Sequence, residues 1–426
     1  MTIIAESIKQ MNGYQLHIVN TQKYKTNTIV WKMKAPLNQT DVTNRALLPY
    51  VLQSNTATYP TTTKLRTYLD DLYGATLFVD LSKKGEYHII SITLEIANEK
   101  FLSDQTPLLR RAFELLSDII TNPNASNHAF HKETVENEKR SLKQKIQSLF
   151  DDKMRYSNFR LVEEMCKEEP YSLHVHGNKD EVENITPESL YQYYQKALAE
   201  DELDLYVIGD VNEQEAEQYA RELLQFNDRE PVKARVIQGE QPVEEKEIKE
   251  IQEVNQGKLN MGYRTHVVYG DSDYYALQVF NGIFGGFSHS KLFINVREKA
   301  SLAYYAASRI ESHKGLMMVM SGIDTKNYHQ AITIIKEQMD AMKQGDFTTQ
   351  ELEQTKAVIR NQLLETIDTS RGLIEVLYHN VVSHSNISLD TWLEEMEKAT
   401  KEEVMAVANK VHLDTVYFLS GMEAGE

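Results

Sequence analysis

An approximately repeated order of predicted elements occurs twice along the chain, and this repeat most limits what the chain can fold into. In the first half the order is strand, two helices, hairpin, two helices and strand, at residues 24–34, 43–52, 62–72, 74–96, 108–120, 133–150 and 203–210. In the second half it is strand, helix, hairpin, three helices and strand, at residues 258–267, 274–284, 302–324, 328–342, 348–366, 389–398 and 415–421. Strands followed by runs of helices predict two similar α+β halves, each a mainly antiparallel sheet packed with helices.

The segment between the two halves has the composition of a linker. It contains Pro231, Pro242 and a dense run of charged residues, which are typical of exposed connections. We therefore predict an N-terminal α+β domain at residues 1–226, a linker at 227–256 and a C-terminal α+β domain at 257–426.

Charge and cysteine usage exclude several classes of function. The chain has 63 acidic and 46 basic residues, a net charge of −17, which disfavours binding to nucleic acid and to anionic membrane surfaces. Its single cysteine, Cys166, excludes an internal disulfide framework and a cysteine-cluster zinc site. Because the N-terminus lacks a basic region followed by an apolar run, and no stretch is long enough for a membrane span, we expect a cytoplasmic location.

One stretch of the second half carries an arginine and a tyrosine that are candidate functional residues. Residues 290–305 read Ser-Lys-Leu-Phe-Ile-Asn-Val-Arg-Glu-Lys-Ala-Ser-Leu-Ala-Tyr-Tyr, so that Arg297 and Tyr304 form an Arg-x6-Tyr pair. A guanidinium and a phenol are suited to hold a peptide carbonyl or to stabilise a developing oxyanion. In the alternative interpretation, Arg297 pairs with Glu298 or Glu311 and Tyr304 is an ordinary strand aromatic.

The stretch around Arg297 resembles the insulinase-like (pitrilysin, M16) metallopeptidases. In the first half the resemblance is carried by residues 168–177, which read Glu-Glu-Pro-Tyr-Ser-Leu-His-Val-His-Gly, and it covers nearly the whole chain. It implies a two-halved fold that forms half of a clamshell around a chamber, with Arg297 and Tyr304 holding the substrate. It also implies that the glycine stretch at 282–287 ends a helix and opens the arginine-bearing segment. Ser301 stands where the family usually has glycine.

Active members of this family carry the motif His-x-x-Glu-His on a helix of the first half, where two histidines bind zinc and the glutamate activates water. The corresponding positions here are Ala46, Pro49 and Tyr50. None of these side chains binds zinc at neutral pH or serves as a general base. The third ligand, a glutamate on a later helix, corresponds to Gln144 or Lys145. All three ligands and the base are therefore absent, and we predict no metal and no cofactor in this chain.

Other residues that can bind metal have simpler interpretations. His128 and His131 stand near a predicted helix start and are expected to cap it, and His174 and His176 are expected to lie in a polar loop. No two histidines stand four positions apart. Cys166 has acidic neighbours, which raise the pKa of a thiol, so we interpret it as structural.

Two functions from different classes remain. In the first, the chain is the zinc-free subunit of a heterodimeric insulinase-like peptidase, not catalytic alone, and Arg297 and Tyr304 face a zinc-bearing paralogous subunit that hydrolyses or processes a peptide. In the second, the chain is a non-hydrolytic pseudo-peptidase that acts as a peptide-binding or scaffold protein. Retention of both residues favours the first function, since a scaffold has no chemical need of the pair.

Overall fold

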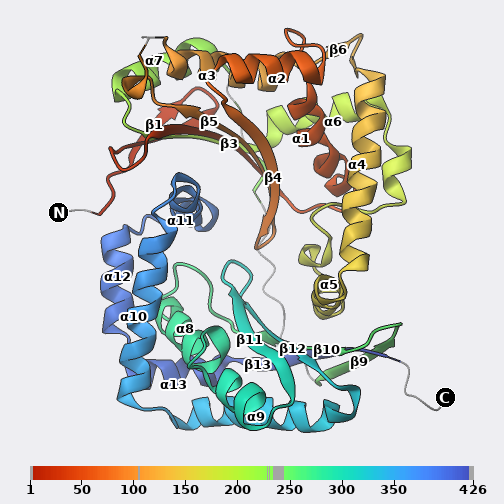
Figure 1. Cartoon of the computed structure of the whole chain (residues 1–426), viewed down its shortest axis with the longest axis vertical. Helices are drawn as coiled ribbons and strands as arrows, with labels where there is room; N and C mark the ends of the chain where they lie inside the picture. Colours follow the sequence, from red (N-terminus) through yellow and green to blue (C-terminus); the bar gives the residue numbers. More distant parts are fainter. Residues whose placement is uncertain (1–2, 104–105, 228, 230, 234–243, 422–426) are drawn as a thin grey trace. The chain divides into compact units, whose positions relative to one another are not determined.

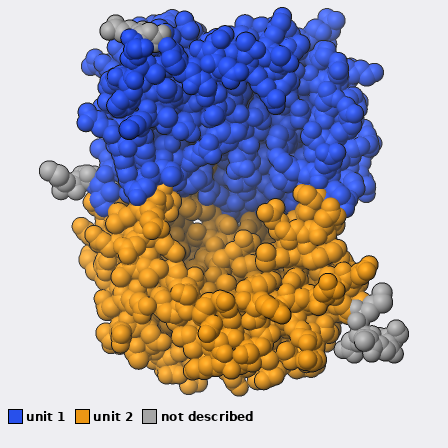
Figure 2. Space-filling model, viewed as in Figure 1, with its two compact units in different colours: residues 1–147, 173–235, 367–376 blue, residues 148–172, 236–366, 377–426 orange. Residues whose placement is uncertain are grey.

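The computed structural model describes residues 3–103, 106–227, 229, 231–233 and 244–421 (Figure 1). It divides into two compact units whose sequence segments interleave (Figure 2). Unit 1 comprises Met1–Gln147, Leu173–Arg235 and Ile367–Val376, and unit 2 comprises Ser148–Ser172, Val236–Thr366 and Leu377–Glu426. Each half of the sequence therefore contributes a segment to the unit that the other half mainly builds.

Unit 1 is built on a six-stranded sheet in the order β1-β2-β8-β3-β5-β4. Its strands are β1 (Ser7–Met11), β2 (Tyr14–Asn20), β3 (Thr26–Pro36), β4 (Thr76–Lys84), β5 (Tyr87–Ala97) and β8 (Glu202–Gly209). β2 and β8 run parallel, and the other neighbours are antiparallel. The predicted strand at 24–34 and the predicted hairpin are confirmed as β3 and β4–β5.

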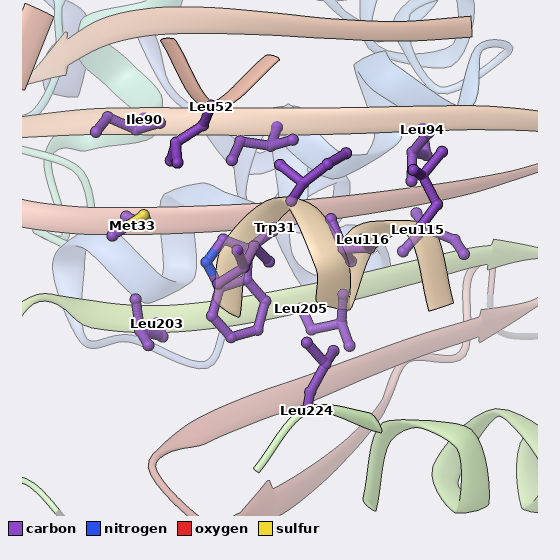
Figure 3. Packing of buried hydrophobic residues seen from close by; sticks show 14 of the residues in the cluster. Trp31, Met33, Leu52, Ile90, Leu94, Leu115, Leu116, Leu203, Leu205 and Leu224 are labelled. Carbon is purple, nitrogen blue, oxygen red and sulfur yellow. The ribbon is translucent and has the colours of Figure 1, made fainter. Parts of the chain in front are cut away.

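Helices cover the apolar face of this sheet. They are α1 (Val42–Ser54), α2 (Thr62–Asp71), α3 (Leu108–Thr121), α4 (Lys132–Asp151), α6 (Pro187–Glu200) and α7 (Glu213–Leu223), with short elements η1 (Glu99–Phe101), β6 (Ala125–Ser126), β7 (Ala129–Phe130) and η3 (Glu181–Asn184). Leu115 and Leu116 of α3 pack with Trp31 and Leu205 of the sheet in a continuous core (Figure 3). The apolar spacing that predicts α3 is the face that this core buries.

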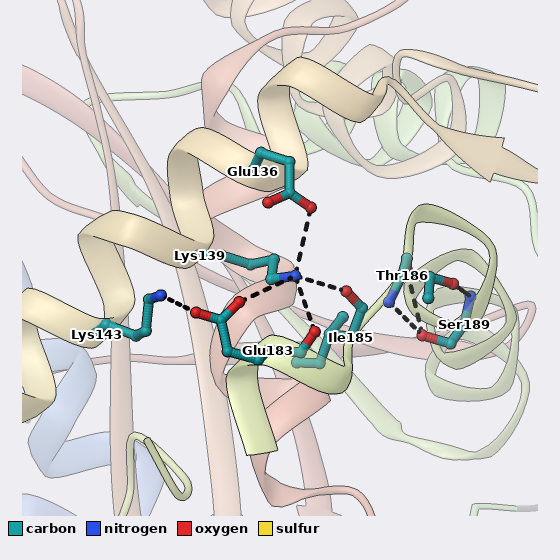
Figure 4. A network of polar contacts seen from close by, with 7 residues as sticks. All are labelled: Glu136, Lys139, Lys143, Glu183, Ile185, Thr186 and Ser189. Atoms are coloured by element: carbon teal, nitrogen blue, oxygen red, sulfur yellow. Dashed lines mark hydrogen bonds and ion pairs between the residues drawn. The ribbon is translucent and has the colours of Figure 1, made fainter. Parts of the chain in front are cut away.

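Lys139 fixes α4 against the loop that follows η3. Its buried ammonium donates to the carbonyl oxygens of Glu183 at 3.2 Å and Ile185 at 3.0 Å, and Lys143 pairs with the Glu183 carboxylate (Figure 4). Thr186 and Ser189 form a capping box that begins α6 directly after this loop. The orientation of α4 matters for the site below, because α4 carries the position of the third zinc ligand.

Unit 2 repeats the strand order of unit 1. Its sheet runs β11-β12-β10-β13-β9, built from β9 (Lys246–Ile251), β10 (Gly257–Arg264), β11 (Ala303–Glu311), β12 (Leu316–Ile323) and β13 (His412–Ser420). This order matches β4-β5-β3-β8-β2, and the pair β13 and β9 is parallel, as is the pair β8 and β2. The expectation of two similar α+β halves with mainly antiparallel sheets is confirmed.

The helical elements of unit 2 include a segment from the first half of the sequence. They are α5 (Lys153–Met165), η2 (Pro170–Ser172), α8 (Tyr274–Asn281), the π-helical turns η4 (Gly282–Gly286) and η5 (Phe293–Lys299), η6 (Thr325–Asn327), α9 (Tyr328–Gln344), α10 (Thr349–Thr366), α12 (Leu389–Lys398) and α13 (Lys401–Lys410). Helix α11 (Ser370–Ser383) begins in unit 1. α5 packs on β10, where a Cβ added at Gly262 would lie 2.6 Å from Sδ of Met165.

The predicted linker lies partly outside the described residues, since 228, 230 and 234–243 are among those not described. Its later part contains β9, which pairs with β13 along the edge of the unit 2 sheet. The boundaries at 226 and 257 stay a prediction. In the described part of the chain, no helix is long and apolar enough to cross a membrane.

Candidate functional site

Helix α1 carries the positions at which active family members have their zinc motif. Ala46 and Pro49 are buried, and Tyr50 is partly exposed at the next position along the helix. The helix is held against the sheet by Arg45, whose buried guanidinium donates to Asp201 at 2.6 Å, to the Tyr193 hydroxyl at 3.0 Å and to the carbonyl oxygen of Met33 at 2.7 Å. α1 is therefore a rigid element without its metal ligands.

Lys145 on α4 occupies the position opposite Tyr50. Its Nζ donates to Oη of Tyr50 at 2.7 Å and lies 4.1 Å from the centre of the tyrosine ring. Of the two residues that the sequence analysis left open, Lys145 is the one that contacts Tyr50. An ammonium repels a divalent cation, and neither a lysine nor a neutral phenol belongs to the usual zinc ligands. These residues do not fit a zinc ion.

A histidine cluster lies in the same unit and includes one residue that the sequence analysis missed. His174 and His176, from the predicted loop, have ring centres 5.4 Å apart, and His88 of β5 lies within electrostatic reach of His176. Burial, together with neighbouring positive charge, lowers the pKa of His174 to about 3 and that of His176 to about 4. Burial and the charges of Arg45 and Lys83 also lower the pKa of His88 well below its usual value.

The three imidazoles are neutral at physiological pH, yet they do not form a metal site. Among the described residues, no group of three or more His, Cys, Asp or Glu side chains is arranged to hold a metal ion. His131 accepts or donates a hydrogen bond with Thr134 at the start of α4, and His128 meets the ring of Tyr191 edge-on. Cys166 is buried at the end of α5. A histidine near the start of an apolar strand, such as His88, offered no pattern that linked it to a distant loop.

Arg297 lies in the last turn of η5 with its charge toward solvent. Val296 beside it is buried and anchors the turn, whereas the Arg297 side chain is 43% exposed. Its guanidinium carbon lies 4.5 Å from the centre of the Phe293 ring, one turn earlier. The nearest ion pair, from Nε to the exposed Glu298 carboxylate, is long at 3.9 Å. An exposed ion pair of this kind contributes little to the free energy of unfolding, so the pair with Glu298 does not give Arg297 a structural role.

Tyr304 lies at the start of β11, at an irregularity of the strand. The pairing of β11 with β12 shifts register between Ala303 and Ala306, which is a β-bulge around Tyr304 and Tyr305. Bulges re-aim side chains and occur often beside functional sites. Tyr304 is 80% exposed, and within the described residues it makes no hydrogen bond or ring contact. η5 packs against β11, so adjoining elements carry the two residues of the predicted pair.

The turn between η5 and β11 explains why the family favours glycine at position 301. Ser301 has φ of +52°, in the left-handed region that glycine adopts most readily. The turn is closed by hydrogen bonds from the amide of Ala300 to the carbonyl of Asn295 and from Leu302 to Val296. Serine is accommodated here without loss of the turn.

Gly285 positions the arginine-bearing segment against the sheet. A Cβ at this residue would lie 2.6 Å from Oγ and 2.8 Å from the backbone nitrogen of Ser308 in β11. Only a residue without a side chain permits this approach. The glycine stretch therefore permits close packing against β11, follows α8 directly and leads into the segment that carries Arg297, as the resemblance implies.

We expect the purified chain to contain far less than one zinc per molecule and to show no chelator-sensitive peptidase activity. The reason is that the side chains that bind zinc in the active enzymes are absent. Elemental analysis after dialysis measures this. A variant with Ala46→His, Pro49→Glu, Tyr50→His and Lys145→Glu should gain zinc. The matched variant with Gln144→Glu in place of Lys145→Glu should bind much more weakly, since Gln144 does not face Tyr50. About one zinc per unmodified chain would contradict the expectation.

Comparison with known proteins identifies the family. The family model described as "Peptidase M16 inactive domain" matches residues 184–359. The chain is 52% identical over 423 residues to the probable inactive metalloprotease YmfF of Bacillus subtilis (strain 168), covering 99% of each chain. It is 22% identical over 293 residues to the uncharacterized zinc protease YmxG of the same organism, covering 66% of this chain and 70% of the relative.

A crystal structure of a conserved protein from Enterococcus faecalis V583 has the same fold, with a TM-score of 0.90 and 36% identity over 99% of this chain and 100% of that chain. The similarity extends through both halves, and the sequence contains no His-x-x-Glu-His. The protein belongs to the insulinase-like (M16) peptidase family, as a member without the zinc-binding motif of the active enzymes.

Proposed function

We propose that this chain is the zinc-free subunit of a heterodimeric insulinase-like peptidase, and that it supplies Arg297 and Tyr304 to a zinc-bearing partner that hydrolyses a peptide. The main observation in support of the proposal is the exposure of Tyr304, which is 80% exposed and lies at a β-bulge. A large aromatic side chain left in solvent on a folded strand is suited to bind a ligand, and its phenol can donate to a peptide carbonyl.

The partner is expected to be a zinc-bearing paralogue. Bacillus subtilis (strain 168) contains both a relative named probable inactive metalloprotease and a relative named uncharacterized zinc protease. One organism therefore encodes relatives of both kinds. Tyr50 and Lys145 do not fit a zinc ion at this position, and in this proposal the catalytic zinc comes from the other subunit. A cytoplasmic location and a peptide substrate are part of the same proposal.

The alternative is a non-hydrolytic pseudo-peptidase that binds a peptide or assembles a complex. The direct contact between Lys145 and Tyr50 is compatible with it, because neither function needs zinc bound at this position. Under this alternative, Arg297 and Tyr304 bind a peptide that no subunit cleaves.

Mixing the purified chain with a zinc-bearing paralogue from the same genome separates the two functions. The heterodimer proposal expects a complex on size exclusion, and peptidase activity that neither subunit has alone. A chain with Tyr304→Ala should still form the complex but lose most of that activity. Subunits that stay separate, or a complex without activity on a library of unrelated peptides, would support the scaffold function instead.

A further inference from the structure

A segment of the second half lies along the polar face of the unit 1 sheet. Residues 367–376 belong to unit 1 although the chain before and after them belongs to unit 2. Tyr24 donates its hydroxyl to the carbonyl oxygen of Ile367 at 2.7 Å, and the hydroxyls of Thr28 and Ser370 are 2.7 Å apart. The contacts follow β3 in order, so the segment runs beside that strand. We call residues 367–376 the strap.

Near the end of the strap, Glu375 forms ion pairs with Lys32 and Lys84, and we call these two ion pairs the clasp. The carboxylate of Glu375 accepts from Nζ of Lys32 on β3 at 2.7 Å and pairs with Nζ of Lys84, at the end of β4, at 3.2 Å. Lys32 is 2% exposed, whereas Glu375 is 49% exposed. Although burial opposes ionisation, the two ammonium groups lower the pKa of Glu375 to about 2. The Glu375 carboxylate is therefore ionised throughout the physiological range.

The strap differs from residues 148–172, the segment of the first half of the sequence that belongs to unit 2. Residues 148–172 are also held by a carboxylate, Glu169, which pairs with Arg264 at 2.6 Å and with Lys314 at 2.6 Å. That segment in addition packs Leu161 and Met165 closely against Gly262. The strap contacts the sheet mainly through hydroxyls, a carbonyl and ion pairs. Its buried Leu373 and Ile374 lie outside the hydrophobic core of the unit.

We propose that the strap, whose residues 370–376 form the start of α11, unwinds and detaches from the sheet while the rest of unit 1 stays folded, and that the Glu375 clasp controls how often it does so. The cost of removing a lysine ammonium from water largely offsets its attraction to the partly exposed carboxylate of Glu375. Water already reaches Glu375, so of this pair only Lys32 must be rehydrated when the strap leaves. The buried side chains of Leu373 and Ile374 become exposed at the same time, which opposes detachment. Detachment uncovers the Lys32 ammonium and the hydroxyls of Thr28 and Ser91, which are donors for the oxygen atoms of a ligand.

Hydrogen exchange of the full-length chain, followed by mass spectrometry, tests the strap. Glu375→Gln removes the charge and keeps the shape, and we expect the amides of 374–376 to exchange roughly tenfold to a hundredfold faster, as expected for the loss of hydrogen bonds to a charged group. Exchange in β3 and β5 should not change. Glu365→Gln is the matched control, because Glu365 is an exposed carboxylate on α10 close to the strap, and it should leave every amide unaffected.

Two results would overturn the proposal. Unchanged exchange at 374–376 in Glu375→Gln would show that the clasp does not control the strap. Equal acceleration in the strap and in β3 would show that the unit unfolds as a whole. If Glu375→Gln fails to fold, Lys84→Gln gives the same comparison from a residue nearer the surface. It should accelerate exchange in the strap alone, by a smaller factor than loss of the carboxylate.

Discussion

In a complex with the zinc-bearing subunit, Arg297→Ala should lower the rate of peptide hydrolysis on the order of 10²–10³, the usual effect of removing one preorganised donor to a developing oxyanion. Tyr304→Phe should act in the same direction. Arg297→Lys should recover only part of the rate, because a point charge does not reproduce the planar guanidinium. The measurements are kcat/KM, zinc content and subunit association for each variant.

Matched surface substitutions control for nonspecific effects. Arg360→Ala removes an exposed arginine of α10 that has only a 3.7 Å pair with Glu397, and Tyr73→Phe removes the hydroxyl of another exposed tyrosine. Neither should change kcat/KM. If Arg297→Ala lowers the melting temperature and leaves the rate per complex unchanged, the pair is structural and its proposed role is wrong.

Asp201→Ala should lower the free energy of unfolding of unit 1 by about 3–5 kcal/mol, because it leaves a buried guanidinium without its counter-ion. Arg45 is only 1% exposed, and its ion pair with Asp201 is 2.6 Å long. Burial opposes the charge of Arg45, but Asp201 raises its pKa above the usual value, so the group stays cationic. The loss therefore exceeds that of an ordinary hydrogen bond.

Urea unfolding followed by tryptophan fluorescence measures this loss. The chain has two tryptophans, and Trp31 lies in the core of unit 1, so a Trp392→Phe background reports on unit 1 alone. Glu222→Ala removes the exposed pair with Arg110, at 3.5 Å, and should change the stability by less than about 1 kcal/mol. The double variant Arg45→Met with Asp201→Leu should lie near the parent. A small effect of Asp201→Ala would contradict a buried charge at Arg45.

Elements with a strong local pattern were predictable from the sequence. The hairpin β4–β5 alternates and turns at a Lys-Gly pair, and α3 repeats its apolar residues at helical spacing. In contrast, β9 reads Lys-Glu-Ile-Lys-Glu-Ile and was interpreted as part of a linker. It is a strand because its backbone pairs with that of β13, and strands at the edge of a sheet tolerate charged side chains. The predicted series of elements also left out β1, β2, α5, α6, α7, α11 and α13. Of these, α5 and α11 belong wholly or partly to the unit that the other half of the sequence mainly builds.

The sequence by itself showed that the zinc-binding motif of the active enzymes is missing, because a motif is present or absent as a matter of residue identity. Ala46, Pro49 and Tyr50 cannot bind zinc in any fold. The sequence also contained the Arg297 and Tyr304 pair and the order of the repeat. These features are local, and a single stretch of residues is enough to read them.

Only the tertiary structure decided which side chains meet. Adjacent residues on a helix point about 100° apart, so the choice between Gln144 and Lys145 depended on how α4 packs, and Lys145 is the one that contacts Tyr50. The clasp of Lys32 with Glu375 joins positions that lie far apart in the chain, and no periodicity links them. Buried charges of this kind are stable only when a distant segment brings the counter-ion, which is a property of the packed molecule.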